Sequence, residues 1–194
     1  MEIGATKAVQ DRLKTTKIEE SKGASLVFCW DTHLTKIKGR NVLFIVNASN
    51  RYTIAMTDIE PRNWNYYAMY IRSVIHGVMQ EMGYSEEQIE QYFKMSGDTT
   101  ITKTHGRKSV GGINRMVMDA QYFGKKLEKE AKYQWELSEY LNRDICQPEG
   151  FDAYGYPNEL FKLDMERLGI ATKRKPAKVI DFAQYIENNR GTNH

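Results

Sequence analysis

The stretch Thr102–Asn114, TKTHGRKSVGGIN, brings a histidine, basic side chains and adjacent glycines together at the expected start of a helix. Helical apolar spacing begins at Ser109, which the pattern predicts to be the N-cap residue. Free backbone N–H groups and the helix dipole favour an anion at such a place. Basic side chains add positive charge there: Lys103, Arg107, Lys108 and Arg115. The stretch predicts a phosphate-binding turn; the alternative is glycines that allow close packing and charges that face water.

The sequence WDTH, Trp30–His33, is a second place where side chains could do chemistry. If it continues the preceding strand, Asp31 and His33 point to the same side of the sheet. They would then act as an orienting carboxylate and a general base, or as two ligands of a divalent metal. A surface turn is the remaining alternative. No cofactor is predicted, and the metal is kept only as an alternative.

The histidines also fit the needs of a metal-free ribonuclease. Such an enzyme needs a general base for the 2′-hydroxyl, a general acid for the leaving oxygen and a cation for the phosphate. His33 and His105 supply the first two residue types, and Lys103 or Arg107 supplies the cation. The candidate catalytic residues are therefore His33, Asp31, His105 and Lys103.

The composition, with 41% hydrophobic and 27% charged residues, is that of a globular protein rather than a disordered one. A net charge of +3 does not identify a nucleic-acid-binding protein, so that argument depends on where the charges cluster. Cys29 and Cys146 form no CxxC pair, so no structural zinc site is predicted. The lack of a signal-like or membrane-spanning apolar run favours a cytoplasmic protein without a membrane partner.

Alternating apolar residues predict strands in the first third of the chain, and helical spacing predicts helices in most of the rest. The expected strands are 1–6, 25–30, 34–38, 41–48, 52–58 and a short run at 98–104. The expected helices are 7–14, 64–82, 85–95, 109–120, 127–145, 158–169 and a weak one at 179–189. This order predicts an α+β fold, with a small antiparallel sheet and a hairpin core packed against several helices, and a helical C-terminal part.

Three segments are expected along the chain. An α+β core domain spans 1–125, a helical extension spans 126–170, and a basic linker with a tail helix spans 171–194. The linker contains TKRKPAK, Thr172–Lys178, whose cationic residues suit nucleic acid through counter-ion release. A soluble connection between domains is the alternative.

A series of landmarks occurs in a specific order and spacing: ATK, W-x-x-x-L, VLFIVNASNRY, DTTITKT and GRKSVGGIN, followed by YQWELSEYLNR and YPNELFKLDMERL. They resemble an uncharacterised bacterial domain family. Its members occur alone or as the N-terminal half of plasmid open-reading-frame-three-like proteins, which are relatives of transposon passengers. The resemblance covers roughly residues 1–168.

The resemblance carries over a set of polar positions: Lys7, Trp30, Asn47, Asn50, Arg51, Thr102, Lys103, Arg107 and Asn114. It departs at W-D-T-H-L, where the family has W-H-A-N-L, so that Asp31 and His33 replace a histidine and an asparagine. The plasmid, phage and transposon setting implies dealings with nucleic acid or with host defence. No activity comes with the family.

The favoured hypothesis is therefore a mobile-element protein that binds RNA and could cleave it, for example the guide RNA of a host defence nuclease, as an anti-CRISPR-like inhibitor. The expected nucleic-acid-binding residues are Lys7, Trp30, Asn47, Arg51, Arg107, Lys108, Asn114, Arg115, Lys173, Arg174 and Lys175. The alternative is a non-enzymatic module that blocks a nuclease or toxin, using aromatic residues of the helix 64–82 and of the FDAYGYP loop. A nucleotide-binding domain that uses the same anion turn is the third hypothesis.

Overall fold

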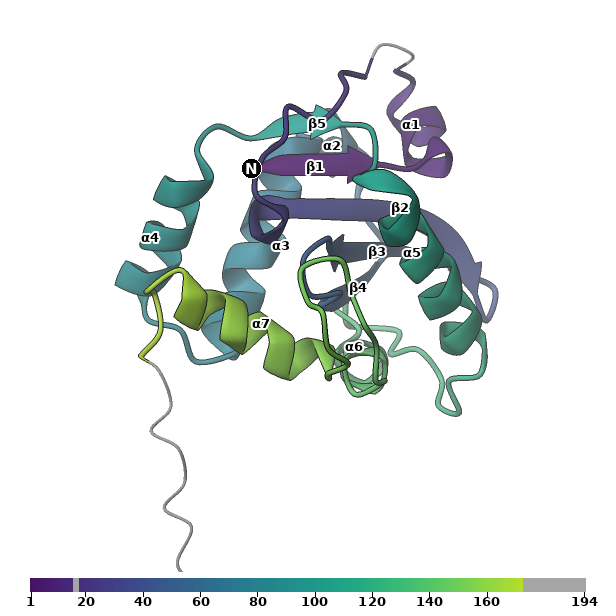
Figure 1. Ribbon diagram of the computed structural model, residues 1–194. Coiled ribbons are helices and arrows are strands. Elements are labelled where there is room, and N and C mark those ends of the chain that lie inside the picture. Colours follow the sequence, from purple (N-terminus) through teal and green to yellow (C-terminus); the bar gives the residue numbers. More distant parts are fainter. Residues whose placement is uncertain (16–17, 173–194) are drawn as a thin grey trace, which may run out of the picture.

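The computed structural model of the chain describes residues 1–15 and 18–172 (Figure 1). Its strands are β1 (Glu2–Ala5), β2 (Cys29–Ile37), β3 (Arg40–Asn47), β4 (Thr53–Thr57) and β5 (Thr100–Thr102). Its helices are α1 (Lys7–Leu13), α2 (Pro61–Asn65), α3 (Tyr67–Glu81), α4 (Glu86–Ser96), α5 (Gly106–Gln121), α6 (Trp135–Asn142) and α7 (Pro157–Arg167), with a 3-10 turn at Leu26–Phe28. The predicted α+β class is confirmed.

The five strands form one mixed sheet in the order β4-β3-β2-β1-β5. Strands β2, β3 and β4 are antiparallel, as predicted. Strand β1, in contrast, pairs in parallel with both β2 and β5. The chain leaves β1 through α1 and a long segment before it enters β2, and such a crossover, unlike a hairpin, permits parallel pairing. The wholly antiparallel sheet expected from the sequence is therefore corrected.

One continuous strand, β2, replaces the two strands expected at 25–30 and 34–38. The residues Leu26–Phe28 form a 3-10 turn, and the strand runs from Cys29 through the WDTH sequence to Ile37. Asp31 and His33 therefore lie inside a strand and, being two residues apart, on the same face. The surface-turn alternative for WDTH is excluded.

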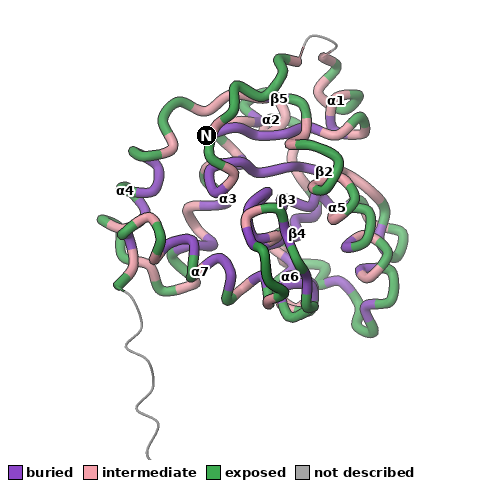
Figure 2. Tube along the Cα trace, viewed as in Figure 1, coloured by how far each residue is buried: buried purple, intermediate pink, exposed green. Residues whose placement is uncertain are grey.

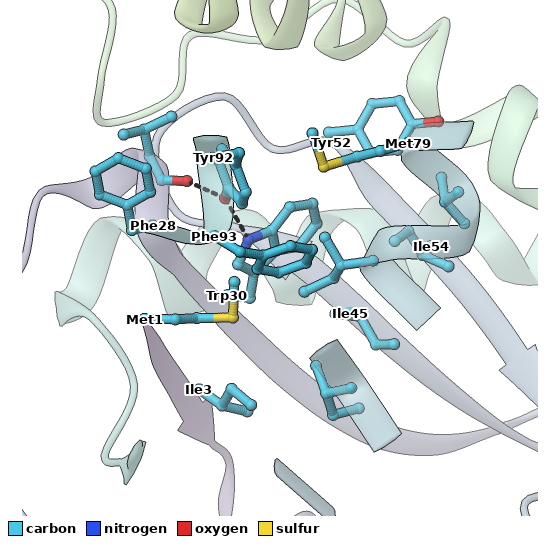
Figure 3. Packing of buried hydrophobic residues seen from close by; sticks show 14 of the residues in the cluster. Met1, Ile3, Phe28, Trp30, Ile45, Tyr52, Ile54, Met79, Tyr92 and Phe93 are labelled. Carbon is cyan, nitrogen blue, oxygen red and sulfur yellow. Dashed lines mark hydrogen bonds between the residues drawn. The ribbon is translucent and has the colours of Figure 1, made fainter. Parts of the chain in front are cut away.

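One face of the sheet packs against α3, α4 and α7, whose apolar residues share a single core with it. At its centre the indole Nε1 of Trp30 donates to the Tyr92 hydroxyl at 2.9 Å, and this hydroxyl donates to the Val27 carbonyl at 2.7 Å (Figure 3). Helix α4 begins at the predicted capping box, in which Ser85 and Gln88 exchange hydrogen bonds.

The other face packs against α5 and α6 through a second core, which includes Phe44, Ile113 and Leu137. Figure 1 shows α5 in front of the sheet and α3 behind it. Figure 2 shows β1 to β4 largely buried, whereas exposed and buried residues alternate along the helices. The sheet is thus the middle of three layers, and the start of α5 lies where β1 and β2 meet.

Helix α6 also closes the outer edge of β4. The Ser138 hydroxyl accepts from the Ala55 N–H at 3.0 Å, and the Asn142 side chain bonds both the N–H and the carbonyl of Thr53 at 2.7 and 2.8 Å. These side chains replace a neighbouring strand and protect the edge. Helix α6 is shorter than the helix expected at 127–145, because the residues just before Trp135 form a loop that lies alongside β4. Within the described part of the chain, no helix is long and apolar enough to cross a membrane.

Candidate functional site

The TKTHGRKSVGGIN stretch connects β5 to α5, and its residues divide between two sides of the helix start. Helix α5 begins at Gly106, which has φ 91°, and His105 is the N-cap residue. The helix therefore starts three residues before the predicted position. Ser109 lies within its first turn and is not an N-cap, which corrects that prediction.

The inner side of this turn forms a buried polar cluster, which we define as Glu2, Asp31, His105 and Ser109. His105 Nδ1 lies 2.7 Å from Asp31 Oδ1, and His105 Nε2 lies 3.0 Å from Glu2 Oε2. The side chains of all three residues are at most 5% exposed. The Ser109 hydroxyl donates to the second oxygen of Asp31. One imidazole thus bridges two buried carboxylates from neighbouring strands.

Asp31 and Cys29 favour the protonated form of this imidazole. Burial by itself lowers the pKa of His105, but the hydrogen bonds and charges of Asp31 and Cys29 outweigh it and raise the pKa to about 10. Burial likewise acts to raise the pKa of Glu2. Hydrogen bonds from the Ser21 hydroxyl, the Lys22 N–H and His105 prevail and lower it. The cluster therefore holds an imidazolium between two carboxylates at neutral pH.

Gly4 makes room for the Asp31 carboxylate. It is the register partner of Asp31 across β1 and β2. A Cβ at this position would lie 1.8 Å from Asp31 Oδ1 and 3.0 Å from the Thr104 Cα, far closer than atoms can approach. The missing side chain lets β1, β2 and the β5–α5 turn meet over a polar group.

The cluster does not have the arrangement of a nucleophilic triad. In a triad, the histidine lies between the carboxylate and the hydroxyl and takes the proton from the nucleophile. Here Asp31 lies between His105 and Ser109, and carboxylates occupy both ring nitrogens of His105. His105 has no free nitrogen for a 2′-hydroxyl, so the geometry does not suit the general acid or base role considered for it.

The other candidate catalytic residues lie apart from this cluster. His33 is half-buried in β2, and its Nδ1 lies 3.1 Å from the Thr6 hydroxyl. Burial lowers the pKa of His33. Lys103 is largely exposed and pairs with Glu20. The structure thus brings Asp31 and His105 together and places His33 and Lys103 elsewhere.

The outer side of the same helix start lines a pocket of ≈ 360 Å³, which we call the cationic pocket. Four of the predicted nucleic-acid-binding residues line it, namely the charged Arg51, Lys108 and Arg115 and the buried Asn47. Its other walls are the end of β3 and the β3–β4 turn, Ser109, Gly111 and Gly112, and residues 147–149. Arg51 lies in the β3–β4 turn and Lys108 in helix α5. Nothing in the sequence indicates that these two residues lie close together in the fold.

Local backbone geometry aims Arg51 into this pocket. Arg51 has φ 62°, and its Nη2 donates to the Gly112 carbonyl at 3.3 Å. A Cβ on Gly112 would lie 3.3 Å from the Arg51 Nε, so the glycine allows this close approach. Lys108 Nζ donates to the Pro148 carbonyl at 3.2 Å. Among the described residues, neither Arg51 nor Lys108 is in an ion pair, whereas Arg115 pairs with Asp119 at 3.2 Å.

Some predicted nucleic-acid contacts are not available at the surface. Trp30 is 1% exposed, and Asn47 is fully buried, with its side chain bonded to Val27, Ser49 and Asn50. Trp30 therefore packs in the core and has no free face for base stacking. Lys7 is exposed but pairs with Asp11 at 2.8 Å.

The remaining predicted contacts lie outside the pocket or outside the described residues. Arg107 and Asn114 are exposed on α5 but do not line the pocket. Lys173, Arg174 and Lys175 lie outside the described residues, as does the tail helix expected at 179–189.

Glu2 of the buried polar cluster and its register partner Cys29 were not among the candidate site residues predicted from the sequence. In EIGA, Glu2 and Gly4 alternate with Ile3 and Ala5, so a carboxylate and a glycine share one face of β1. That alternation was the available signal for Glu2. Cys29 is a free, buried cysteine, and it pairs in register with Glu2.

Residues 2–160 match the profile of a family described as Domain of unknown function (DUF6933). The chain belongs to this family. The match covers most of the chain and confirms a resemblance to an uncharacterised domain family, while the bacterial and plasmid setting stays a prediction. No curated protein and no solved structure matches the chain.

Proposed function

We propose that this DUF6933 protein binds RNA through its phosphate groups at the cationic pocket. The observation that carries the proposal is the convergence of Arg51, Lys108 and Arg115 on one pocket. They come from the β3–β4 turn and from α5, so their proximity is a product of the fold. Glu149 also lines the pocket, which leaves an excess of positive charge.

The chemistry of these groups suits a phosphate. Arg51 offers a planar guanidinium that can bond two phosphate oxygens at once, and Lys108 offers a compact point charge. Neither pairs with a carboxylate within the described residues, so binding an anion breaks no ion pair there. The glycine backbone at residues 111 and 112 lets a ligand approach closely.

We propose that the protein binds RNA without cleaving it. Cleavage would need a free general base and a general acid on either side of the bound phosphate. His105 holds two carboxylates and faces the sheet, and neither His33 nor Lys103 lines the cationic pocket. The mobile-element setting implied by the sequence resemblance makes a guide-type RNA the first ligand to test.

Fluorescence anisotropy with a labelled single-stranded RNA tests the proposal. The double variant Arg51→Gln, Lys108→Gln is expected to bind about tenfold more weakly or worse, because each lost charged contact contributes more than about 1 kcal/mol. The matched control Lys94→Gln, Lys129→Gln removes the same charge from exposed sites that form no ion pair within the described residues, and it should leave the affinity nearly unchanged. Equal losses in both variants, or no binding by the wild type, would contradict the proposal.

One observation favours a protein-binding module as the second candidate. Tyr66 and Met69 are 69% and 72% exposed and line an apolar groove of ≈ 420 Å³ with Trp64 and Ile101. This groove involves the helix 64–82 that the alternative hypothesis singled out, here divided into α2 and α3. Tyr66→Ser with Met69→Ser should then abolish complex formation with a nuclease in gel filtration, while RNA binding is unaffected.

A further inference from the structure

Glu2, Cys29 and His105 place a carboxylate oxygen, a thiol sulfur and an imidazole nitrogen within 4.8 Å of one another. Glu2 and Cys29 are register partners on β1 and β2, and His105 reaches them from the start of α5. All three residues are held by the fold from separate parts of the chain. The Cys29 thiol also lies 3.7 and 3.5 Å from the carbonyl oxygens of Ala24 and Ser25.

We propose that these residues bind Zn²⁺, with His105 Nε2, Glu2 Oε2 and Cys29 Sγ as its protein ligands. Thiolate, imidazole and carboxylate are the groups that zinc takes in proteins, and the thiolate disfavours Mg²⁺ and Ca²⁺. Ligand atoms around a tetrahedral zinc ion lie roughly 3–4 Å from each other, given metal–ligand distances of about 2.0–2.3 Å. His105 Nε2 and Glu2 Oε2 are already 3.0 Å apart, and all three ligand atoms lie within 4.8 Å of one another. Three protein ligands leave the fourth position to water.

Asp31 supplies the outer group that such a histidine requires. A zinc-bound histidine usually donates its second ring N–H to a carboxylate, which fixes the ring and its tautomer. Asp31 Oδ1 lies 2.7 Å from His105 Nδ1, the nitrogen opposite the proposed ligand atom. Asp31 is fixed in turn by the Ser109 hydroxyl and by the His105 N–H at 3.2 Å. Asp31 is thus a positioning residue.

A short exposed segment separates the site from solvent. The Ser21 hydroxyl donates to Glu2 Oε2 at 2.6 Å, and the Lys22 N–H donates to Glu2 Oε1 at 2.8 Å. Zinc binds a thiolate and an unprotonated imidazole nitrogen, so protons leave the cluster as the divalent ion enters.

The experiment is a Co²⁺ titration of the EDTA-treated full chain, followed by displacement with Zn²⁺. Cobalt is expected to bind at 1:1 and to show thiolate-to-metal charge-transfer absorption together with tetrahedral d–d bands. Cys29→Ser should lose the charge-transfer absorption. The matched control Cys146→Ser, which changes the other buried cysteine, should keep it. Calorimetry in buffers of different ionisation enthalpy should report proton release on Zn²⁺ binding.

Asp31→Asn separates a positioning role from general stability. It should weaken Zn²⁺ binding about 10–100-fold while the cobalt charge-transfer absorption is kept, because the ligands themselves remain. If the wild type shows neither cobalt absorption nor a Zn²⁺-induced rise in Tm, the proposal is overturned, whatever the variants do. The same holds if Cys146→Ser loses the absorption and Cys29→Ser keeps it. RNA binding is not part of this test, because the proposed metal ligands do not line the cationic pocket.

Discussion

The inner and outer sides of the α5 start carry opposite kinds of polar chemistry. On the inner side, His105 and Ser109 bond the carboxylates of Glu2 and Asp31, whose side chains are at most 5% exposed. On the outer side, Lys108 and Arg115 face an open pocket together with Arg51. The groups of the buried cluster are bonded to each other. In the cationic pocket, by contrast, Arg51 and Lys108 form no ion pair with a carboxylate among the described residues. This difference is the basis for proposing a metal site on the inner side and an anion site on the outer side.

The largest effect is expected from Asp31→Ala, which removes the partner of both His105 and Ser109. His105 keeps its pair with Glu2, but its Nδ1 and the Ser109 hydroxyl lose their buried acceptor, which should lower the free energy of unfolding by about 3–5 kcal/mol. Urea denaturation of EDTA-treated protein measures it. Asp11→Ala, which breaks the exposed pair with Lys7, should cost less than about 1 kcal/mol. Similar losses in both variants would erase the distinction between the buried cluster and an ordinary surface pair.

A smaller loss is expected from Gly4→Ala. The added methyl group would overlap the Asp31 carboxylate and should lower the free energy of unfolding by about 1–3 kcal/mol. Gly111→Ala on the outer side of α5 is the matched control. Apart from the helix's own backbone, no atom lies within 4 Å of the place its methyl group would take, so it should raise helix stability by about 0.5–1 kcal/mol. Chemical denaturation of the two variants should therefore give opposite signs, and equal signs would contradict the packing described.

The charge of His105 predicts how stability depends on pH in metal-free protein. Its folded pKa of about 10 lies above the unfolded value of about 6.5, so the folded state binds the extra proton. This contribution is complete below about pH 6.5 and is lost as pH rises to about 10, with a slope of at most about 1.4 kcal/mol per pH unit. His105→Gln should flatten the decline in urea midpoints over this range in the presence of EDTA. An unchanged slope would show that the imidazolium is not present.

Elements with a local signal were predictable from the sequence. The capping box at Ser85 fixed the start of α4, and the alternation in TIAMT predicted β4. The continuity of β2 through Asp31 was not predictable, because a charged residue in a buried strand is tolerated only if a distant partner, here His105, compensates it.

For the candidate site, too, only local signals were predictive. The sequences TKTHGRKSVGGIN and WDTH showed its residue types, and the family resemblance added Arg51 as a candidate. The assignments of Ser109 as a helix cap and of Trp30 as a nucleic-acid contact failed because both residues make tertiary contacts instead, with Asp31 and with Tyr92. The parallel position of β1, which brings Glu2 and Cys29 together, follows from topology and has no local signal.

The salt dependence of RNA binding tests the central claim, that the outer side of α5 holds phosphate, most directly. The logarithm of the association constant should fall linearly with the logarithm of salt concentration, with a slope of about −0.7 for each phosphate neutralised on a single strand. Changing Arg51 and Lys108 to glutamine should reduce the slope by about 1.4 without changing the free energy of unfolding by more than about 0.5 kcal/mol. An identical slope in the double variant and the wild type would show that the RNA phosphates lie elsewhere.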